Sequence, residues 1–165
     1  MQNTESQGGP GISLREATES AAPVRIFHRV LDWMTSERFQ LLNITDRIQG
    51  VVRRSGIREG LVHIQSLHTT TALLINEWQA ALLEDIKRVL EELVVRDRPW
   101  RHNDPAFSDC DRGNADAHLR GMLLGQSLCL QVRNAAVLLG AWQSIILAEL
   151  DGPRTRQVAV QVLGL

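Results

Sequence analysis

Residues 127–165 read SLCLQVRNAAVLLGAWQSIILAELDGPRTRQVAVQVLGL, and the apolar side chains in this part of the chain fall into strand-length segments. The separators between the segments, 133–135 and 151–153, contain Asn, Asp, Gly and Pro, which favour turns. Segments joined by such turns predict an antiparallel run at this end of the chain. The expected strands are 127–132, 137–150 and 155–163.

Toward the N-terminus, shorter apolar or alternating segments predict further strands. A short helix is expected among them, because Thr45 and Asp46 can cap a first turn and Gly56 can end the last one. Its apolar stripe consists of Ile48, Val51 and Val52. The expected strands of this half are 24–31, 38–44, 61–67 and 72–75.

The clearest helix pattern covers residues 80–95, where aliphatic residues recur at helical spacing and charged residues occupy the other face. The aliphatic residues are Leu82, Leu83, Ile86, Val89, Leu90 and Leu93. Residues 96–113 are polar and contain two prolines, which predicts a long loop. A further helix is expected over 115–124, with Asn114 as its N-cap and Gly125 at its end.

This order of elements predicts the fold class. Strands at both ends of the chain with helices between them indicate an α+β fold, with a mostly antiparallel, β-sandwich-like sheet and two or three helices. We expect one domain over residues 24–165, because this length suits a single compact core. Residues 1–23 combine Gly and Pro with Ser, Glu, Gln and Thr, which predicts a flexible N-terminal tail.

Charge and composition narrow the function classes. Eighteen basic and nineteen acidic residues give a net charge of −1, so a nucleic-acid-binding surface is not expected. No apolar segment is long enough to span a bilayer, so no membrane partner is expected either. The two cysteines do not make a disulfide framework, since Cys129 lies in an apolar segment and Cys110 in a polar one. These features predict a cytoplasmic protein.

Three histidines are candidates for chemistry. His68 ends an expected strand and is followed by Thr69 and Thr70, whose hydroxyl oxygens could bind a ligand beside the imidazole. The alternative is a hydrogen-bonded structural corner. His102 lies in the long loop and could be a metal ligand, with Asn103 or Asp104 available to orient it. The alternative for this group is a solvated polar turn with a packed tryptophan.

His118 is expected in the first part of a helix, where the helix N-terminus favours the neutral imidazole, a form that can bind a metal. The alternative is a semi-exposed helical histidine without a ligand. Its spacing from His68 and His102 does not match a compact zinc motif, so any shared site depends on folding. Three neutral imidazoles with an open fourth position could hold a divalent metal, zinc or magnesium, and polarise a phosphate oxygen.

Several other polar residues could complete such a site. Glu77 or Glu149 could act as general acid or base, and Asn76 precedes the first of these carboxylates. The alternative for Glu77 is a turn residue with a favourable charge near a helix start. Gln143 could reach a ligand, and Arg154 beside a turn could bind phosphate.

Trp142 carries a large apolar surface close to Gly140, at a point where the glycine could interrupt the expected strand 137–150. Packing in the core is the expectation for this tryptophan.

Short motifs in a fixed order run from the first candidate histidine to the last candidate arginine, and this set resembles the YjbQ-like family, also called the secondary thiamine-phosphate synthase family. Weaker similarity extends from about Val24 to Gly164. The motifs read His68-Thr69-Thr70, Asn76-Glu77, Asp85, His102-Asn103-Asp104, Asn114-Ala115, Ala117-His118-Leu119, Leu124-Gly125, Leu139-Gly140, Trp142-Gln143 and Asp151-Gly152-Pro153-Arg154.

The resemblance implies a small α+β protein that assembles as a homotrimer, with a pocket between subunits for a metal or an anion. It also implies a low-level thiamine-phosphate synthase activity, which joins a pyrimidine diphosphate to a thiazole phosphate. An Asp-Pro pair common in the family is replaced here by Ala80-Ala81, so a non-catalytic trimeric module that binds a metabolite or anion is the alternative. The implied site residues are the histidines His68, His102 and His118 and the acidic residues Glu77, Asp85 and Glu149.

Overall fold

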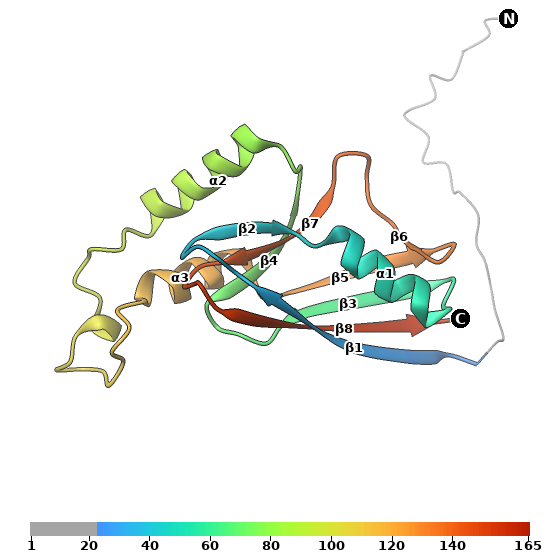
Figure 1. The fold of residues 1–165 in the computed structure, drawn as a ribbon, viewed down its shortest axis with the longest axis horizontal. Helices are drawn as coiled ribbons and strands as arrows, with labels where there is room; N and C mark the ends of the chain where they lie inside the picture. Colours follow the sequence, from blue (N-terminus) through green and yellow to red (C-terminus); the bar gives the residue numbers. More distant parts are fainter. Residues whose placement is uncertain (1–22) are drawn as a thin grey trace, which may run out of the picture.

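The larger of two antiparallel sheets forms one side of the protein in the computed structural model, which describes residues 23–165 (Figure 1). The expected tail, 1–23, lies outside the described residues except for Pro23. The sheet has five strands, in the order β1 (Arg25–Met34), β8 (Thr155–Gly164), β3 (Gly60–Ser66), β5 (Ser127–Arg133) and β6 (Ala136–Val137). All neighbouring strands pair antiparallel, as the sequence predicts.

The smaller sheet has three strands, β2 (Gln40–Asn43), β7 (Ser144–Glu149) and β4 (Thr71–Asn76), with β7 in the centre. One face of this sheet packs against helix α1 (Thr45–Ser55) and the inner face of the larger sheet. Its other face packs against α3 (Ala115–Leu124) and, more loosely, α2 (Ala80–Leu93). Strand β7 is therefore buried on both faces, which explains its continuous apolar run.

The main core lies between the two sheets, and side chains from α1 fill it. The expected stripe of α1 is buried, and Gly56 ends the helix with a left-handed φ of 69°. The core residues are Ile44, Ile48, Val51, Val52, Ile57, Val62, Ile64, Leu73, Val132, Val137, Ile145, Leu147, Val158, Val160 and Val162. The predicted α+β class with an antiparallel, sandwich-like arrangement is confirmed.

The expected strand 137–150 is not continuous. Strand β6 ends at Val137, and residues 138–143 leave the sheet before β7 begins at Ser144. Trp142 lies on this excursion with 76% of its surface exposed, so the prediction that it packs in the core is wrong. Residues 138–143 read LLGAWQ, an apolar stretch without alternation, so composition suggested a continuous strand and only Gly140 signalled the interruption.

Helix α2 has the expected bounds within two residues, but only part of its apolar stripe is covered. Leu90 is buried, whereas Val89 and Leu93 are 51% and 64% exposed. Arg120 of α3 donates from Nε to the Leu90 carbonyl at 3.2 Å and from Nη2 to the Val94 carbonyl at 2.8 Å. The end of α2 is thus held to α3 by hydrogen bonds to its last carbonyls rather than by a continuous apolar interface.

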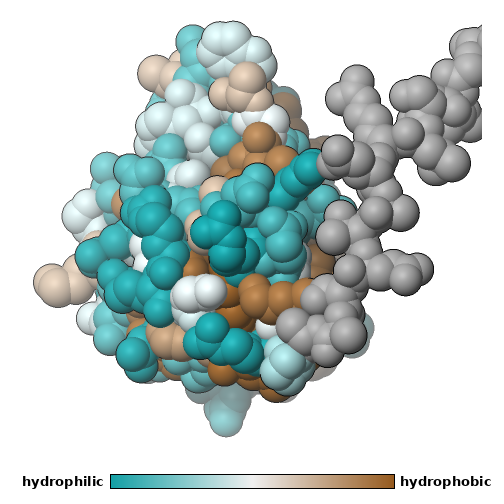
Figure 2. Space-filling model, turned by 90° about the vertical axis from the view of Figure 1, so that its right-hand side faces the viewer, coloured by the Kyte–Doolittle hydropathy of each residue, from teal (hydrophilic) through white to brown (hydrophobic). Residues whose placement is uncertain are grey.

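Figure 2 views the molecule from the end where β8 finishes, at the right of Figure 1. Hydrophilic residues cover most of this face, and hydrophobic residues form a patch near its centre. Within residues 23–165, no helix combines the length and the apolar character needed to cross a membrane.

A buried ion pair joins the two sheets. Glu149, at the end of β7, is fully buried and accepts from Arg156 of β8 at 2.6 Å (Nε to Oε2) and 2.5 Å (Nη2 to Oε1). The carboxylate also accepts from the Thr35 hydroxyl and the Asp151 backbone N–H, and Arg156 donates to the Thr70 hydroxyl. The pair is bidentate and hydrogen-bonded on all sides, which offsets the cost of burying two charges.

Removing one member of this pair leaves the other charge buried and unpaired. We expect Arg156→Met to lower the free energy of unfolding by about 3–5 kcal/mol, measured by urea denaturation. The exposed pair Asp85–Arg88 on α2 provides the matched control, since Arg88→Met should cost at most about 0.5 kcal/mol. Equal losses in the two variants would contradict a structural role for the buried pair.

Candidate functional site

Two of the candidate histidines meet at the start of α3. His102 belongs to the short helix η1 (Arg101–Asn103), and His118 lies in the first turns of α3. Asn103 Oδ1 accepts the backbone N–H of Ala115 at 2.9 Å, which ties η1 to the first turn of α3. This bond brings the two imidazoles together although they are far apart along the chain.

The expected cap of α3 is different. Asn114 stands at the N-cap position, but its side chain makes no capping bond and donates instead to Asp151 Oδ2 at 2.9 Å. The amide of Asn103 takes over the capping contact. Asn114 was expected as the cap because it directly precedes the helix. The fold shows that Asn103, from the long loop, supplies the capping oxygen.

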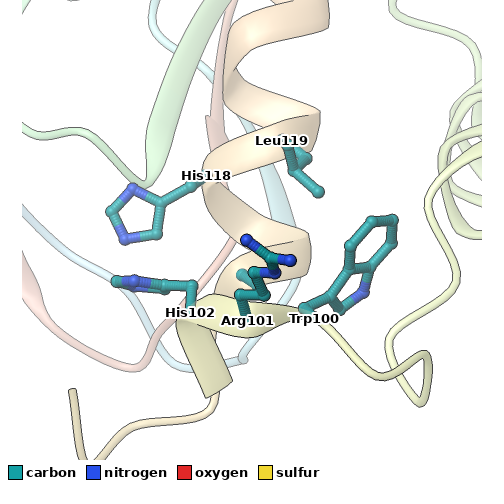
Figure 3. A pocket seen from close by; sticks show the side chains of 6 residues that line it. Trp100, Arg101, His102, His118 and Leu119 are labelled. Carbon is teal, nitrogen blue, oxygen red and sulfur yellow. The ribbon is translucent and has the colours of Figure 1, made fainter. Parts of the chain in front are cut away.

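The rings of His102 and His118 are 4.9 Å apart between centroids and lie nearly perpendicular, at 82°. They form one wall of a cavity of about 280 Å³, and Figure 3 shows the Arg101 side chain between this pair and the Trp100 indole. Ala115 and Leu119 of α3 complete the lining. The cavity therefore combines two imidazoles and one guanidinium with apolar surface.

The surroundings of His118 favour its neutral form. Burial lowers the pKa of His118 from its ordinary value of 6.5, and the charge of His102 lowers the pKa further. The carboxylates of Asp151 and Asp116 act in the opposite direction but do not reverse the shift. A neutral imidazole has a lone pair available for a metal ion or for a proton.

A second cavity, of about 380 Å³, lies beside His118 and is lined by Thr69, Gly121, Met122, Gly125 and Gln126. The turn after β3 approaches α3 closely at this point, because a Cβ on Gly121 would lie 3.2 Å from the Thr69 carbonyl oxygen. Of the residues expected to bind a ligand, Thr69 is the one that shares a cavity with a histidine.

His68 is positioned differently from the other two histidines. Its Nε2 accepts the backbone N–H of Gln157 at 2.8 Å, which links the turn after β3 to β8. Burial and then the charge of Arg156 lower the pKa of His68, while Glu149 opposes the shift. The ring nitrogen is thus engaged as an acceptor, in agreement with the alternative of a hydrogen-bonded corner.

The three histidines do not converge within one chain. Among residues 23–165, no group of three or more His, Cys, Asp or Glu side chains is arranged to hold a metal ion. The structure brings together His102 and His118 and leaves His68 at the neighbouring turn. A three-imidazole site is therefore not formed by the described part of a single chain.

The expected catalytic carboxylates lie in three different places. Glu149 is committed to its buried pair with Arg156. Glu77 follows β4 at the end opposite Thr71, so it lies about 20 Å from that residue at roughly 3.3 Å per strand residue. Asp85 is 65% exposed on α2 and lines a different cavity, of about 320 Å³.

The remaining expected ligand-binding residues are engaged elsewhere. Thr70 is buried and accepts from Arg156, and Asn76 Oδ1 accepts the Glu77 backbone N–H at 2.9 Å. Gln143 Oε1 accepts the Gly140 backbone N–H at 2.8 Å within the excursion after β6. Arg154 donates to Asp151 at 3.4 Å.

A network of buried carboxylates and arginines behind α3 was not predicted from the sequence. Asp151 is 1% exposed and is paired with Arg38 at 2.9 Å, Arg112 at 3.1 Å and Arg154. Asp116, in the first turn of α3, is paired with Arg38 and Arg120, each at 3.2 Å. Arg120 and Arg154 lie within four residues of their partners, whereas Arg38 and Arg112 are distant along the chain and carry no local signal for this convergence.

Arg101 and Trp100 were also missed as cavity residues. Their position next to His102 in one short turn is the signal that could have identified them. The Arg101 guanidinium stacks over the Phe107 ring at 5.1 Å, and the Trp100 indole N–H donates to the Val95 carbonyl at 2.9 Å. The cavity can therefore present imidazole nitrogens and the Arg101 guanidinium to an anionic ligand.

Comparison with known proteins agrees with the architecture. The family described as UPF0047 protein YjbQ-like matches residues 29–165. A UPF0047 protein of Methanothermobacter thermautotrophicus is 43% identical over 141 residues, which cover 86% of this chain and 94% of that protein. The UPF0047 protein YugU of Bacillus subtilis is 31% identical, with 82% and 98% covered.

Solved structures give the same result for the fold. A YbjQ-like protein of unknown function from Sulfolobus solfataricus superposes with a TM-score of 0.80 and 36% identity, covering 86% of this chain and 99% of that one. A hypothetical protein from Aeropyrum pernix superposes with a TM-score of 0.76 and 33% identity, covering 84% and 98%. The two-sheet arrangement with three helices is thus shared with these proteins.

The lowered pKa values of His68 and His118 make stability depend on acidity. Below pH 6.5 the unfolded chain takes up protons on these histidines before the folded chain does, so the free energy of unfolding falls as the pH falls. We expect His118→Gln to lose less stability than the parent protein between pH 7 and about pH 5, measured by urea denaturation. A parallel decline in both proteins would contradict a neutral His118 in the folded state.

Proposed function

Because the chain belongs to the UPF0047 protein YjbQ-like family, we propose that its function resides in the cavity of His102 and His118, as a site for a divalent metal ion and a phosphate-bearing small molecule. The observation that carries this proposal is the pair of imidazoles, 4.9 Å apart, on the wall of a cavity that also contains a guanidinium. The proposal rests on two histidines, whereas the sequence suggested three.

His102 and His118 can supply part of the ligand set of a metal ion. Two nitrogens come from separate elements, η1 and α3, and the bond between Asn103 and Ala115 fixes their relative position. Zinc accepts imidazole nitrogen at about 2.0–2.1 Å, and a catalytic or ligand-exchanging site leaves positions open for water or an anion. When bound, such an ion would act as a Lewis acid on a phosphate oxygen.

The cavity also supplies groups for the rest of a phosphate-bearing ligand. Arg101 offers guanidinium donors that suit phosphate oxygens, and its stacking on Phe107 leaves the charge in place. Trp100 and Leu119 offer apolar surface to an organic group. Thr69 in the adjoining cavity adds a hydroxyl on the other side of His118.

A second candidate function is ligand binding without catalysis, and the positions of the carboxylates support it. Glu149 is held by Arg156, and Glu77 and Asp85 lie away from the paired histidines within one chain. No acidic residue therefore lines either cavity beside His118 among residues 23–165. This supports a non-catalytic module that binds a metabolite or an anion.

Assembly as a homotrimer belongs to the same proposal. It is supported by apolar side chains on α2 and α3 that the single chain leaves exposed. These are Val89, Leu93, Met122 and Leu123, with exposed fractions of 51%, 64%, 71% and 54%. A neighbouring subunit at these helices would lie next to the cavity and could add groups to it.

Metal binding should depend on the paired histidines. In a variant with both cysteines replaced by serine, we expect His102→Asn or His118→Asn to weaken Zn²⁺ binding at least about tenfold. Mutating a residue that only hydrogen-bonds to a metal ligand already weakens metal affinity by about that factor. Isothermal titration in the presence of inorganic phosphate measures the effect. His28→Asn, on the exposed face of β1, is the matched control and should leave binding unchanged.

His68→Gln is the informative third variant. Because His68 accepts from Gln157 and stands outside the pair, this variant should retain binding. Loss of Zn²⁺ affinity on His68→Gln, or full affinity without His102 and His118, would contradict the proposed ligand pair. Sedimentation velocity on each variant separates lost ligands from lost assembly.

The activity that the resemblance implies can be tested on the same proteins. Incubation with the pyrimidine diphosphate, the thiazole phosphate and Mg²⁺ should give slow product formation that disappears in His118→Asn and persists in Glu77→Gln, measured by mass spectrometry. Loss of turnover in Glu77→Gln would place that carboxylate in the site. No product from the parent protein would favour the non-catalytic module.

A further inference from the structure

We propose that this protein has a second metal site, formed by His63 of β3 and Cys129 of β5 on the outer face of the larger sheet, for a thiophilic ion such as Zn²⁺. This proposal is independent of the function assigned to the cavity beside α3, because it uses other elements and other residues. It follows from strand register and exposure.

The register places the two residues directly opposite each other. Strands β3 and β5 pair antiparallel, with His63 facing Cys129. Directly opposite residues in an antiparallel pair have Cβ atoms about 4.5–5.5 Å apart, on the same face of the sheet. An imidazole nitrogen and a thiolate sulfur from such positions can both reach one ion, at about 2.0–2.1 Å and about 2.3 Å respectively.

The face that carries the pair is the solvent side of the sheet. Along β3 the buried residues Val62 and Ile64 flank His63, which is exposed. Along β5, Cys129 is exposed while Leu128 and Leu130 point toward the core. Both side chains therefore project away from the core and on the same side.

The exposure of Cys129 is unusual for its residue type. A free cysteine is among the most frequently buried residues, since its side chain behaves as a small apolar group. Within residues 23–165, the strand ladder uses the backbones of Cys129 and His63, but neither side chain takes part in a hydrogen bond, an ion pair or a ring contact. The side chains are thus open on an accessible surface, with nothing in the described chain that competes for the sulfur or the imidazole.

The neighbouring strands extend the same row of polar residues. Gln161 of β8 lies opposite His63 on the other side, and His28 of β1 lies opposite Gln161. The Gln161 amide can orient the imidazole or a bound water. His28 is two strands away from His63, a separation of about 10 Å. His28 is therefore not assigned to the site, which consists of His63 and Cys129.

The chemistry of binding is a ligand exchange. The Cys129 thiol loses its proton to solvent, its sulfur forms a bond to the hydrated ion, and one metal-bound water leaves; the neutral imidazole of His63 displaces a second water. Water molecules occupy the remaining positions, since no third His, Cys, Asp or Glu among residues 23–165 joins the pair. Thiolate and imidazole together select soft or borderline ions over Mg²⁺ and Ca²⁺.

Cobalt titration tests the site directly, because a Co²⁺–thiolate bond gives a charge-transfer absorption that imidazole or carboxylate ligands do not. The protein used is the full chain carrying His102→Asn and His118→Asn, so the cavity does not contribute. We expect one Co²⁺ per chain with this absorption, displaced by Zn²⁺ and accompanied by proton release. Cys129→Ser should abolish the band, and His63→Asn should weaken binding at least about tenfold.

Cys110→Ser is the matched control, since Cys110 is the other free cysteine and should leave the band unchanged. His63 and Cys129 are both exposed on the surface of the larger sheet, so circular dichroism should show the parent fold when either is substituted. A band that survives Cys129→Ser, an affinity unaffected by His63→Asn, or the absence of any thiolate band in the starting protein would each overturn the proposal.

Discussion

Charge burial at the end of β7 is the constraint on which the candidate site depends. Glu149 and Asp151 are both buried, and a buried carboxylate must be matched by cations and donors or it destabilises the fold. Arg156 of β8 pairs with Glu149, and Arg38, Arg112 and Arg154 pair with Asp151. Arg38 and Arg112 are distant from Asp151 along the chain, so their pairing fixes how the segment before β2 and the long loop meet the turn after β7.

The same network positions α3 and hence the paired histidines. The Asn114 side chain is drawn to Asp151, which anchors the start of α3 and leaves its Ala115 N–H free for Asn103. One buried carboxylate thus holds the helix, and one capping bond brings the loop histidine to it. His118 then stands between two cavities, one apolar with a guanidinium and one lined by the turn after β3.

Local sequence features predicted the elements well and their partners poorly. The turn at 133–135 and the bounds of α3 follow from turn chemistry and periodicity, and both are confirmed, with Asn134 and Ala135 at positive φ. Trp142 was expected in the core because it is large and apolar and lies in an apolar run, although residues 138–143 leave the sheet. The placement of Glu77, at the opposite end of β4 from Thr71, is a consequence of strand length and pairing that no local motif encodes.

Anomalous diffraction at the zinc absorption edge, from crystals of the Cys110→Ser/Cys129→Ser variant grown with Zn²⁺, tests metal binding by the paired histidines most directly. We expect an anomalous peak in the cavity beside α3, within about 2.0–2.1 Å of one nitrogen of His102 and one of His118. A peak bound to His68 without these two, or no peak between the paired imidazoles, would contradict this expectation.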